Sequence, residues 1–305
     1  MSAAPGLLTH PFFLLSSILG LGSLLFAADR ALPHSALVVC ALSLAGLLAR
    51  AASLRRGESK ASLSREDFAL LHAVDIKSLG PWVKQNIRGH EEVVDLVMGE
   101  LQKGLSLASA ERTLGAFFLV GPTGTGKTFL ANLISQALFP GSELVALRMN
   151  QFKHPDDVIT LLGPPPGQPG YEIGGALTRP VLENPRRIIL LDEFEKCHPD
   201  IQHCLYNVLD TGQCRDKSSG RTVYFHACVF FATCNAGVPD LRRAWEGTTD
   251  LNKRLGRGRE ALAKAASFEK ALLARFDGIY LMDALDPLES AEVACLQLAF
   301  HWKKF

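Results

Sequence analysis

The chain has 305 residues, which is enough for one large or two small domains. Its charge is nearly balanced, with Lys+Arg 32 against Asp+Glu 31, and this argues against nucleic acid as a partner. Its seven cysteines are scattered without a CxxC pair, so neither a zinc site nor a disulfide framework is indicated, and a reducing compartment fits.

The first fifty residues predict a membrane anchor. Residues 11–28 form an apolar run without a charged residue, and residues 31–49 form a second one. As a helix, each would span roughly 27 to 29 Å, close to the thickness of the hydrocarbon layer. The first ten residues contain no Lys or Arg, whereas Arg50, Arg55, Arg56 and Lys60 follow the second run. This bias predicts a transmembrane hairpin over 1–50, in a bacterial inner membrane, with the rest of the chain in the cytoplasm.

Other interpretations of the two apolar runs stay open. A signal peptide would need a basic start, which this sequence lacks. A buried helical hairpin of a soluble domain is compatible with the small residues Ser16, Ser17 and Gly20 in the first run. A single spanning helix, with the other run lying in the membrane interface, is a third interpretation. Residues 51–80 are charged and rich in serine, which is typical of a connector.

The most informative segment is residues 121–128, which read GPTGTGKT and match the pattern GxxxxGK[ST]. An apolar run of strand length, 116–120, precedes it, and residues 129–138 have apolar positions at helical spacing. Glycines between a strand and a helix let backbone N–H groups turn inward and surround a phosphate. Lys127 is expected to reach the β- and γ-phosphates, and the Thr128 hydroxyl is expected to ligate Mg²⁺. The predicted nucleotide-binding residues are Gly121, Pro122, Thr123, Gly124, Thr125, Gly126, Lys127 and Thr128.

A second motif supports the first. Residues 188–191 are apolar, as in a strand buried on both faces of a parallel sheet, and Asp192 and Glu193 follow. We expect Asp192 to hold Mg²⁺ through water and Glu193 to orient and polarise the attacking water. No guanine-reading NKxD motif is present, so ATP is the predicted nucleotide, with Mg²⁺ as the cofactor.

From Ile87 to about Asp286, some two-thirds of the chain resembles a Clp-type AAA+ ATPase, in particular the second ATPase module of ClpB-like disaggregases. The resemblance implies an α/β fold for residues 81–286: the large subdomain of an AAA+ P-loop NTPase, with a parallel sheet flanked by helices. Residues 287–305 would then form a terminal helix, as a truncated lid. The stretches that carry the resemblance are LLDEFEKCHPD, VLDTGQCRD, GRTVYF, FFATCNAG and GPPPGQPGYEIGGALT.

The resemblance also implies roles for single residues. Ile87 and His90 match the segment near the adenine pocket, and Asn235 matches the polar residue that positions the lytic water. An amide suits that position because it donates and accepts hydrogen bonds without adding charge. Arg275 matches the arginine finger that a neighbouring subunit supplies, which implies a homo-oligomeric ring, a hexamer in this family.

One loop departs from the family pattern. The family's threading loop carries Gly-Tyr-Val-Gly, whereas this chain has Gly167-Gln168-Pro169-Gly170. Gln168 offers little apolar contact to a polypeptide, and Pro169 stiffens the backbone. This loop argues against robust unfolding by threading.

The sequence as a whole predicts a membrane-anchored AAA+ ATPase. Its oligomeric ring would couple ATP hydrolysis to remodelling or disassembly of an unidentified protein partner near the membrane. The alternative is a nucleotide-gated structural or assembly component of an envelope or secretion machine, with slow hydrolysis and no threading. Gln168 and the short segment after residue 286 favour that alternative. A peptidase partner is discounted because no LGF- or IGF-like docking tripeptide occurs.

Overall fold

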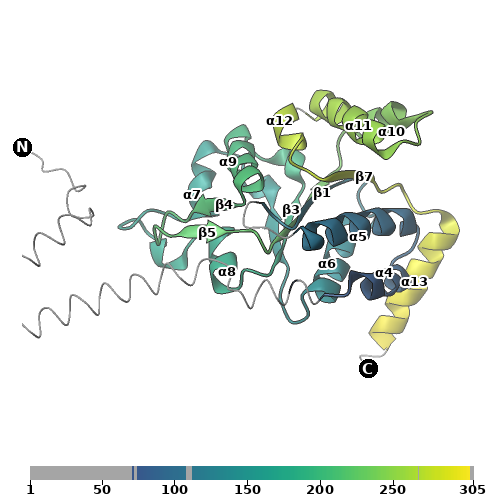
Figure 1. Cartoon of the computed structure of the whole chain (residues 1–305), viewed down its shortest axis with the longest axis horizontal. Helices are drawn as coiled ribbons and strands as arrows, with labels where there is room; N and C mark the ends of the chain where they lie inside the picture. The colour runs from purple at the N-terminus through teal and green to yellow at the C-terminus, as the bar shows by residue number, and fades with distance from the viewer. Residues whose placement is uncertain (1–70, 72–73, 108–111, 267, 303–305) are drawn as a thin grey trace, which may run out of the picture. The chain divides into compact units, whose positions relative to one another are not determined.

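The computed structural model describes residue 71 and residues 74–107, 112–266 and 268–302 (Figure 1). Helices and strands alternate along most of this part, as in α/β proteins. The strands are β1 (Gly115–Val120), β2 (Val145–Arg148), β3 (Ile188–Asp192), β4 (Gln213–Arg215), β5 (Thr222–Tyr224), β6 (Val229–Cys234) and β7 (Gly278–Leu281). The helices are α4 (Ile76–Asn86), α5 (Glu91–Ser106), α6 (Lys127–Leu138), α7 (Val158–Leu162), α8 (Thr178–Glu183), α9 (Pro199–Thr211), α10 (Val238–Trp245), α11 (Leu251–Ala265), α12 (Lys270–Leu273) and α13 (Pro287–Trp302). Short 3-10 turns are η1 (Met149–Gln151), η2 (Pro155–Asp157), η3 (Tyr171–Ile173) and η4 (Phe194–Lys196).

Five of the strands form one sheet in the order β2-β3-β6-β1-β7, with every neighbouring pair parallel. Strand β6 therefore lies between β1 and β3, although it follows both of them in the chain. The carboxyl ends of parallel strands meet at one edge of a sheet, and ligands of open α/β sheets bind at that edge. The segments that follow β1, β3 and β6 are thus brought side by side. Strands β4 and β5 form a separate antiparallel hairpin.

Each face of the sheet packs against its own layer of helices. Along β1, Phe117 and Leu119 contribute to a buried cluster with α4, α5 and α6, whereas Ala116, Phe118 and Val120 contribute to a second cluster with α9 to α12. This alternation follows from the two-residue period of a strand. Because both faces are buried, the strands are apolar at nearly every position, as the sequence indicated. Figure 1 shows α4, α5 and α6 on one side of the strands and α9, α11 and α12 on the other.

The structure confirms the α/β fold with a parallel sheet flanked by helices. The apolar runs predicted as strands at 116–120 and 188–191 become β1 and β3, and the helix expected after the glycine loop becomes α6. The domain boundaries at residues 81 and 286, and the interpretation of 287–305 as a truncated lid, stay predictions.

The prediction about the membrane requires a correction. The predicted hairpin, 1–50, lies outside the described residues, as does most of the connector predicted for 51–80. A spanning helix needs about 20 apolar residues, whereas α5 and α13 have 16 residues each. Within the described part of the chain, no helix is long and apolar enough to cross a bilayer. This finding contradicts the predicted membrane localisation.

Candidate active site

The glycine loop joins the end of β1 to the start of α6 and is shaped by the backbone freedom of its glycines. Gly126 caps the N-terminus of α6 with φ 90°, a left-handed conformation that side chains with a Cβ rarely adopt. Gly121 is required for a different reason: a Cβ there would lie 2.1 Å from the carbonyl oxygen of Met282, which follows β7. The loop therefore exposes the first N–H groups of α6, which is the arrangement that binds anions.

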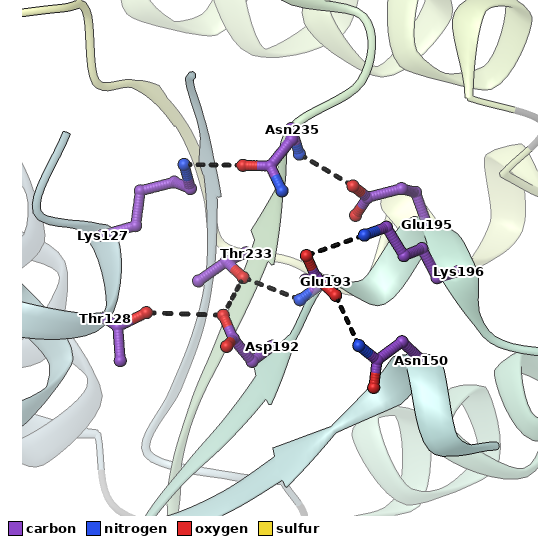
Figure 2. Close-up of polar contacts among 9 residues, drawn as sticks. All are labelled: Lys127, Thr128, Asn150, Asp192, Glu193, Glu195, Lys196, Thr233 and Asn235. Atoms are coloured by element: carbon purple, nitrogen blue, oxygen red, sulfur yellow. Dashed lines mark hydrogen bonds and ion pairs between the residues drawn. The ribbon is translucent and has the colours of Figure 1, made fainter. Parts of the chain in front are cut away.

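The Lys127 side chain lies back over this loop. Its Nζ donates to the carbonyl oxygens of Gly121 and Pro122, both at 2.7 Å, and to Oδ1 of Asn235 at 3.0 Å (Figure 2). Burial lowers the pKa of Lys127, which is only 7% exposed. A buried ammonium group held by neutral oxygens alone lacks a partner of full opposite charge, so an anionic ligand at this position would stabilise it.

Asp192 stands at the end of β3, opposite the start of α6. Its Oδ1 accepts a hydrogen bond from Oγ1 of Thr233 at 2.6 Å and one from Oγ1 of Thr128 at 3.4 Å. Thr233 belongs to β6, so one carboxylate oxygen links the ends of three elements: α6, β3 and β6 (Figure 2).

The backbone of Glu193 turns sharply after β3. It is the one non-glycine residue with positive φ, 58°, among the residues that the structure describes. Its N–H donates to Oγ1 of Thr233 at 2.9 Å, while its carboxylate points away from Asp192. There Oε2 accepts from Nδ2 of Asn150 and Oε1 accepts from Nζ of Lys196, both at 2.8 Å. The hydrogen bond from Lys196 lowers the pKa of the Glu193 carboxyl.

Asn235 follows β6 and lies between the glycine loop and the turn after β3. Its side-chain Oδ1 accepts from Lys127, and its backbone N–H donates to Oε1 of Glu195 at 3.0 Å (Figure 2). The other oxygen of Glu195, Oε2, is buried without a hydrogen-bond partner. Lys127 therefore holds the side-chain oxygen of Asn235, while Glu195 holds its backbone.

Of the two residues predicted near the adenine, Ile87 and His90, the structure shows His90 in contact with the glycine loop. The His90 Nε2 lies 2.9 Å from the carbonyl oxygen of Thr125, and because a carbonyl only accepts, this nitrogen must carry the proton. Burial lowers the pKa of His90, which is 6% exposed. Ile87 is buried at the C-terminal cap of α4. The predicted adenine contacts of both residues stay predictions.

The oxygen donors at this edge fit a magnesium ion. Mg²⁺ prefers oxygen ligands and is commonly held by one or two carboxylates together with the phosphates of a substrate. Thr128 and Asp192 supply a hydroxyl and a carboxylate within 3.4 Å of each other. In the described part of the chain, no group of three or more His, Cys, Asp or Glu gathers as a metal site would require. The hydroxyl and the carboxylate supply part of a coordination sphere that the phosphates of a nucleotide can complete.

Arg275 does not join these residues. It lies between α12 and β7, and Asp277 two positions later donates its N–H to the carbonyl of Ala116 at the start of β1. The phosphate loop begins at the other end of that strand, at Gly121. Five residues of extended chain separate the two ends by roughly 17 Å. Arg275 is thus at the sheet edge opposite to its own phosphate loop.

Several contributors to the site were not predicted. Thr233, Asn150, Glu195 and Lys196 all bond to predicted site residues. Thr233 had a visible signal, because it is a hydroxyl within an otherwise apolar strand. Lys196, three residues after Glu193, had the signal of spacing on one turn. Asn150 had no signal in the sequence that would link it to the site, because it comes from the turn after β2.

Comparisons with families and with curated proteins agree with this geometry. The model of the family described as AAA domain (Cdc48 subfamily) matches residues 112–279. The chain is 32% identical over 249 residues to the ATP-dependent Clp protease ATP-binding subunit ClpE of Lactococcus lactis, covering 79% of this chain and 32% of that protein. It is 36% identical over 216 residues to Chaperone protein ClpB 1 of Nostoc, covering 70% of this chain and 24% of that protein. It is 34% identical over 240 residues to Chaperone protein ClpB of Nitratidesulfovibrio vulgaris, covering 77% of this chain and 27% of that protein. The chain thus spans about a third or less of these relatives.

Proposed function

Because the chain belongs to the family of AAA domains of the Cdc48 subfamily and is an ATPase, we propose that it hydrolyses Mg²⁺-ATP between neighbouring copies in a ring and uses the energy to remodel a protein partner. The observation that carries the proposal is the gathering of Lys127, Thr128, Asp192 and Asn235 at the carboxyl edge of β1, β3 and β6. The relatives named as chaperones support a protein as the substrate.

In this proposal the glycine loop and Lys127 bind the triphosphate. The phosphate oxygens replace the loop carbonyls as the acceptors of Nζ, which restores full ionic pairing to a buried ammonium group. Thr128 and Asp192 hold Mg²⁺, which when bound neutralises charge on the β- and γ-phosphates. Ile87 and His90 contact the adenine side of the nucleotide.

Glu193 acts as the base toward the attacking water, and Asn235 orients that water. For this role the Glu193 carboxylate must turn away from Asn150 and Lys196, which hold both of its oxygens. The lowered pKa keeps this carboxyl ionised at neutral pH, and loss of the bond from Lys196 on rotation would make it a stronger base.

Arg275 acts on the nucleotide of a neighbouring copy. Its position, roughly 17 Å along β1 from its own phosphate loop, supports action in trans. Repeating the same head-to-tail contact between copies closes a ring. A guanidinium at the transferring phosphoryl group stabilises the charge of the transition state, worth about 10³ to 10⁵ in rate in related enzymes.

The variant Glu193→Gln tests the chemistry. It should bind ATP and retain it, because the loop, Lys127 and Asp192 are intact, whereas turnover should fall by roughly a hundredfold or more since the base is lost. Single-turnover hydrolysis of radiolabelled ATP and a filter-binding assay measure the two quantities.

Glu183→Gln is the matched control, because its carboxylate lies on the surface of α8 and pairs only with Arg179 among the described residues. It should hydrolyse ATP at the parent rate. Parent-like turnover in Glu193→Gln would show that another group takes the proton.

A second function has one observation in its favour. The loop between α7 and α8 carries Gln168 where an aromatic residue would grip a polypeptide, although Tyr171 and Ile173 farther along it are exposed. The chain would then assemble and disassemble with its nucleotide state without threading a substrate. ATP-dependent loss of structure in a tagged, folded substrate supports remodelling. Assembly that follows the nucleotide, with the substrate left folded, supports the structural function.

A further inference from the structure

The guanidinium of Arg275 is held by two residues of helix α9, which we call the arginine seat: Tyr206 and Asp210. The Arg275 Nε lies 2.6 Å from Oδ1 of Asp210 in an ion pair, and its Nη2 donates to the Tyr206 hydroxyl at 2.9 Å. The same guanidinium lies over the Tyr206 ring, 5.1 Å from its centroid. Ion pair, hydrogen bond and cation–π contact together restrict a side chain that is otherwise flexible.

The charge of Asp210 does not stabilise its own helix. It lies in the last turn of α9, where the helix dipole disfavours a negative charge. Among the described residues, Asp210 forms an ion pair with Arg275. Tyr206 is one turn earlier on the same face, so the two residues approach the guanidinium together.

The backbone that carries Arg275 is also held. Arg259 of α11 donates from Nε to the carbonyl of Leu273 at 3.1 Å and from Nη2 to that of Phe276 at 2.8 Å. Leu273 and Phe276 are themselves buried. The side chain of Arg275 nevertheless remains 36% exposed. The fold therefore fixes this arginine while leaving part of it open to a neighbouring copy.

We propose that Tyr206 and Asp210 are positioning residues, which orient Arg275 toward the triphosphate held by the next copy in the ring. This inference rests on the proposed function, in which Arg275 acts in trans. An arginine has five N–H donors in a rigid plane. In the seat, Asp210 pairs with the guanidinium by charge and Tyr206 accepts from Nη2, so other N–H donors stay available to the phosphoryl oxygens. A guanidinium that is already oriented loses less rotational freedom in the reaction.

The test mixes two full-length variants that are inactive alone. Donor subunits carry Glu193→Gln and supply only Arg275, whereas acceptor subunits carry Arg275→Ala and supply only an intact site. Their mixture should hydrolyse ATP at active junctions. Adding Asp210→Ala to the donor should lower the kcat of the mixture by roughly ten- to a hundredfold with KM for ATP unchanged, because only the orientation of a catalytic group is lost.

Graded variants separate positioning from damage to the fold. Tyr206→Phe in the donor keeps the ring and should lose less activity than Tyr206→Ala, which loses both ring and hydroxyl. Donor Asn207→Ala, an exposed neighbour on α9, should leave the mixture at full activity.

The outcomes distinguish the inference from the function on which it rests. If the unsubstituted mixture regains no turnover, the trans action of Arg275 is wrong and the seat has no role. If the mixture is active and the donor variants of Asp210 and Tyr206 match the control, the positioning role alone is overturned. If the same substitutions in the acceptor lower the turnover of the mixture equally, they damage the fold, and this result also overturns the positioning role.

Discussion

The backbone of Glu193 determines how the carboxylates of Asp192, Glu193 and Glu195 diverge. Its left-handed backbone, φ 58°, is uncommon outside glycine and persists only where the surroundings hold it. The bond from its N–H to Thr233 is one such constraint. As a result Asp192 faces Thr128, the Glu193 carboxylate faces Asn150, and Glu195 reaches Asn235. A glycine at this position would remove the strain and the base together.

At the same scale, His90 makes a prediction about pH. Burial lowers its pKa in the folded chain, whereas the unfolded chain titrates near the ordinary value of about 6.5. As the pH falls through that value the unfolded state takes up a proton first, so stability decreases toward acid. His90→Gln keeps a donor for the Thr125 carbonyl but does not titrate. We expect its Tm to fall less than that of the parent between about pH 8 and about pH 5.5.

Thermal unfolding followed by circular dichroism at the two pH values measures this effect. His226 is also buried, with its pKa lowered by burial, so part of the pH dependence should remain in the variant. If the difference in Tm between parent and variant is the same at both pH values, His90 is not the group that causes the loss of stability toward acid.

At the scale of elements, strand β1 connects the two ends of the proposed machinery. Phe118 is fully buried, and its ring lies 4.9 Å from that of Phe276, 5.3 Å from that of Phe268 and 6.2 Å from that of Phe194. Phe194 is next to Glu193, and Phe276 is next to Arg275. One aromatic cluster thus packs against both the segment that carries Glu193 and the segment that carries Arg275.

This packing predicts a large loss of stability for Phe118→Ala. Removing a buried ring from a close-packed core leaves a cavity and typically costs about 3–5 kcal/mol. Phe129→Ala is the control, because that ring is 51% exposed and its removal should change stability by no more than about 0.5 kcal/mol. Urea unfolding of full-length variants measures both. Similar losses in the two variants would contradict the central role of the cluster.

Many of the helices and strands could be predicted from the sequence. The apolar runs of β1, β3 and β6 and the helical spacing of α6 are local patterns, and the structure has these elements at those places. The order of strands was not accessible in this way. That β6 lies between β1 and β3 depends on contacts between residues more than forty positions apart. Asn150 enters the site only because β2 pairs with β3.

At the scale of the whole molecule, the exposed loop between α7 and α8 is the feature on which the two proposed functions differ. It is exposed around Gln168, and its ends are held by hydrogen bonds from Leu177 to Leu161 and from Lys217 to Leu162. A loop anchored at its base and exposed at its tip can contact another polypeptide. Its chemistry at position 168, an amide in place of an aromatic ring, limits the apolar contact that it makes.

Substituting that position should therefore change substrate handling and not hydrolysis. An aromatic contact is worth about 0.5–1.5 kcal/mol, so Gln168→Tyr should speed ATP-dependent unfolding of a folded substrate by a few-fold. ATP turnover should stay at the parent rate, because the loop is not part of the nucleotide site. Fluorescence loss of a tagged folded protein measures the unfolding, and Gln168→Asn is the control. No unfolding by either variant would favour the structural function.

From its sequence alone, this protein's phosphate loop and its carboxylates after a buried strand could be derived, because each depends on neighbours within a few residues, and the family resemblance implied the parallel α/β fold. Tertiary structure alone decided that Thr233, Asn150 and Glu195 orient those groups, and that Arg275 rests on α9 at the far edge of the sheet. Such contacts join distant segments, and their geometry depends on strand order and helix packing that no local pattern encodes. The membrane localisation read from hydropathy was the prediction that the described structure contradicted.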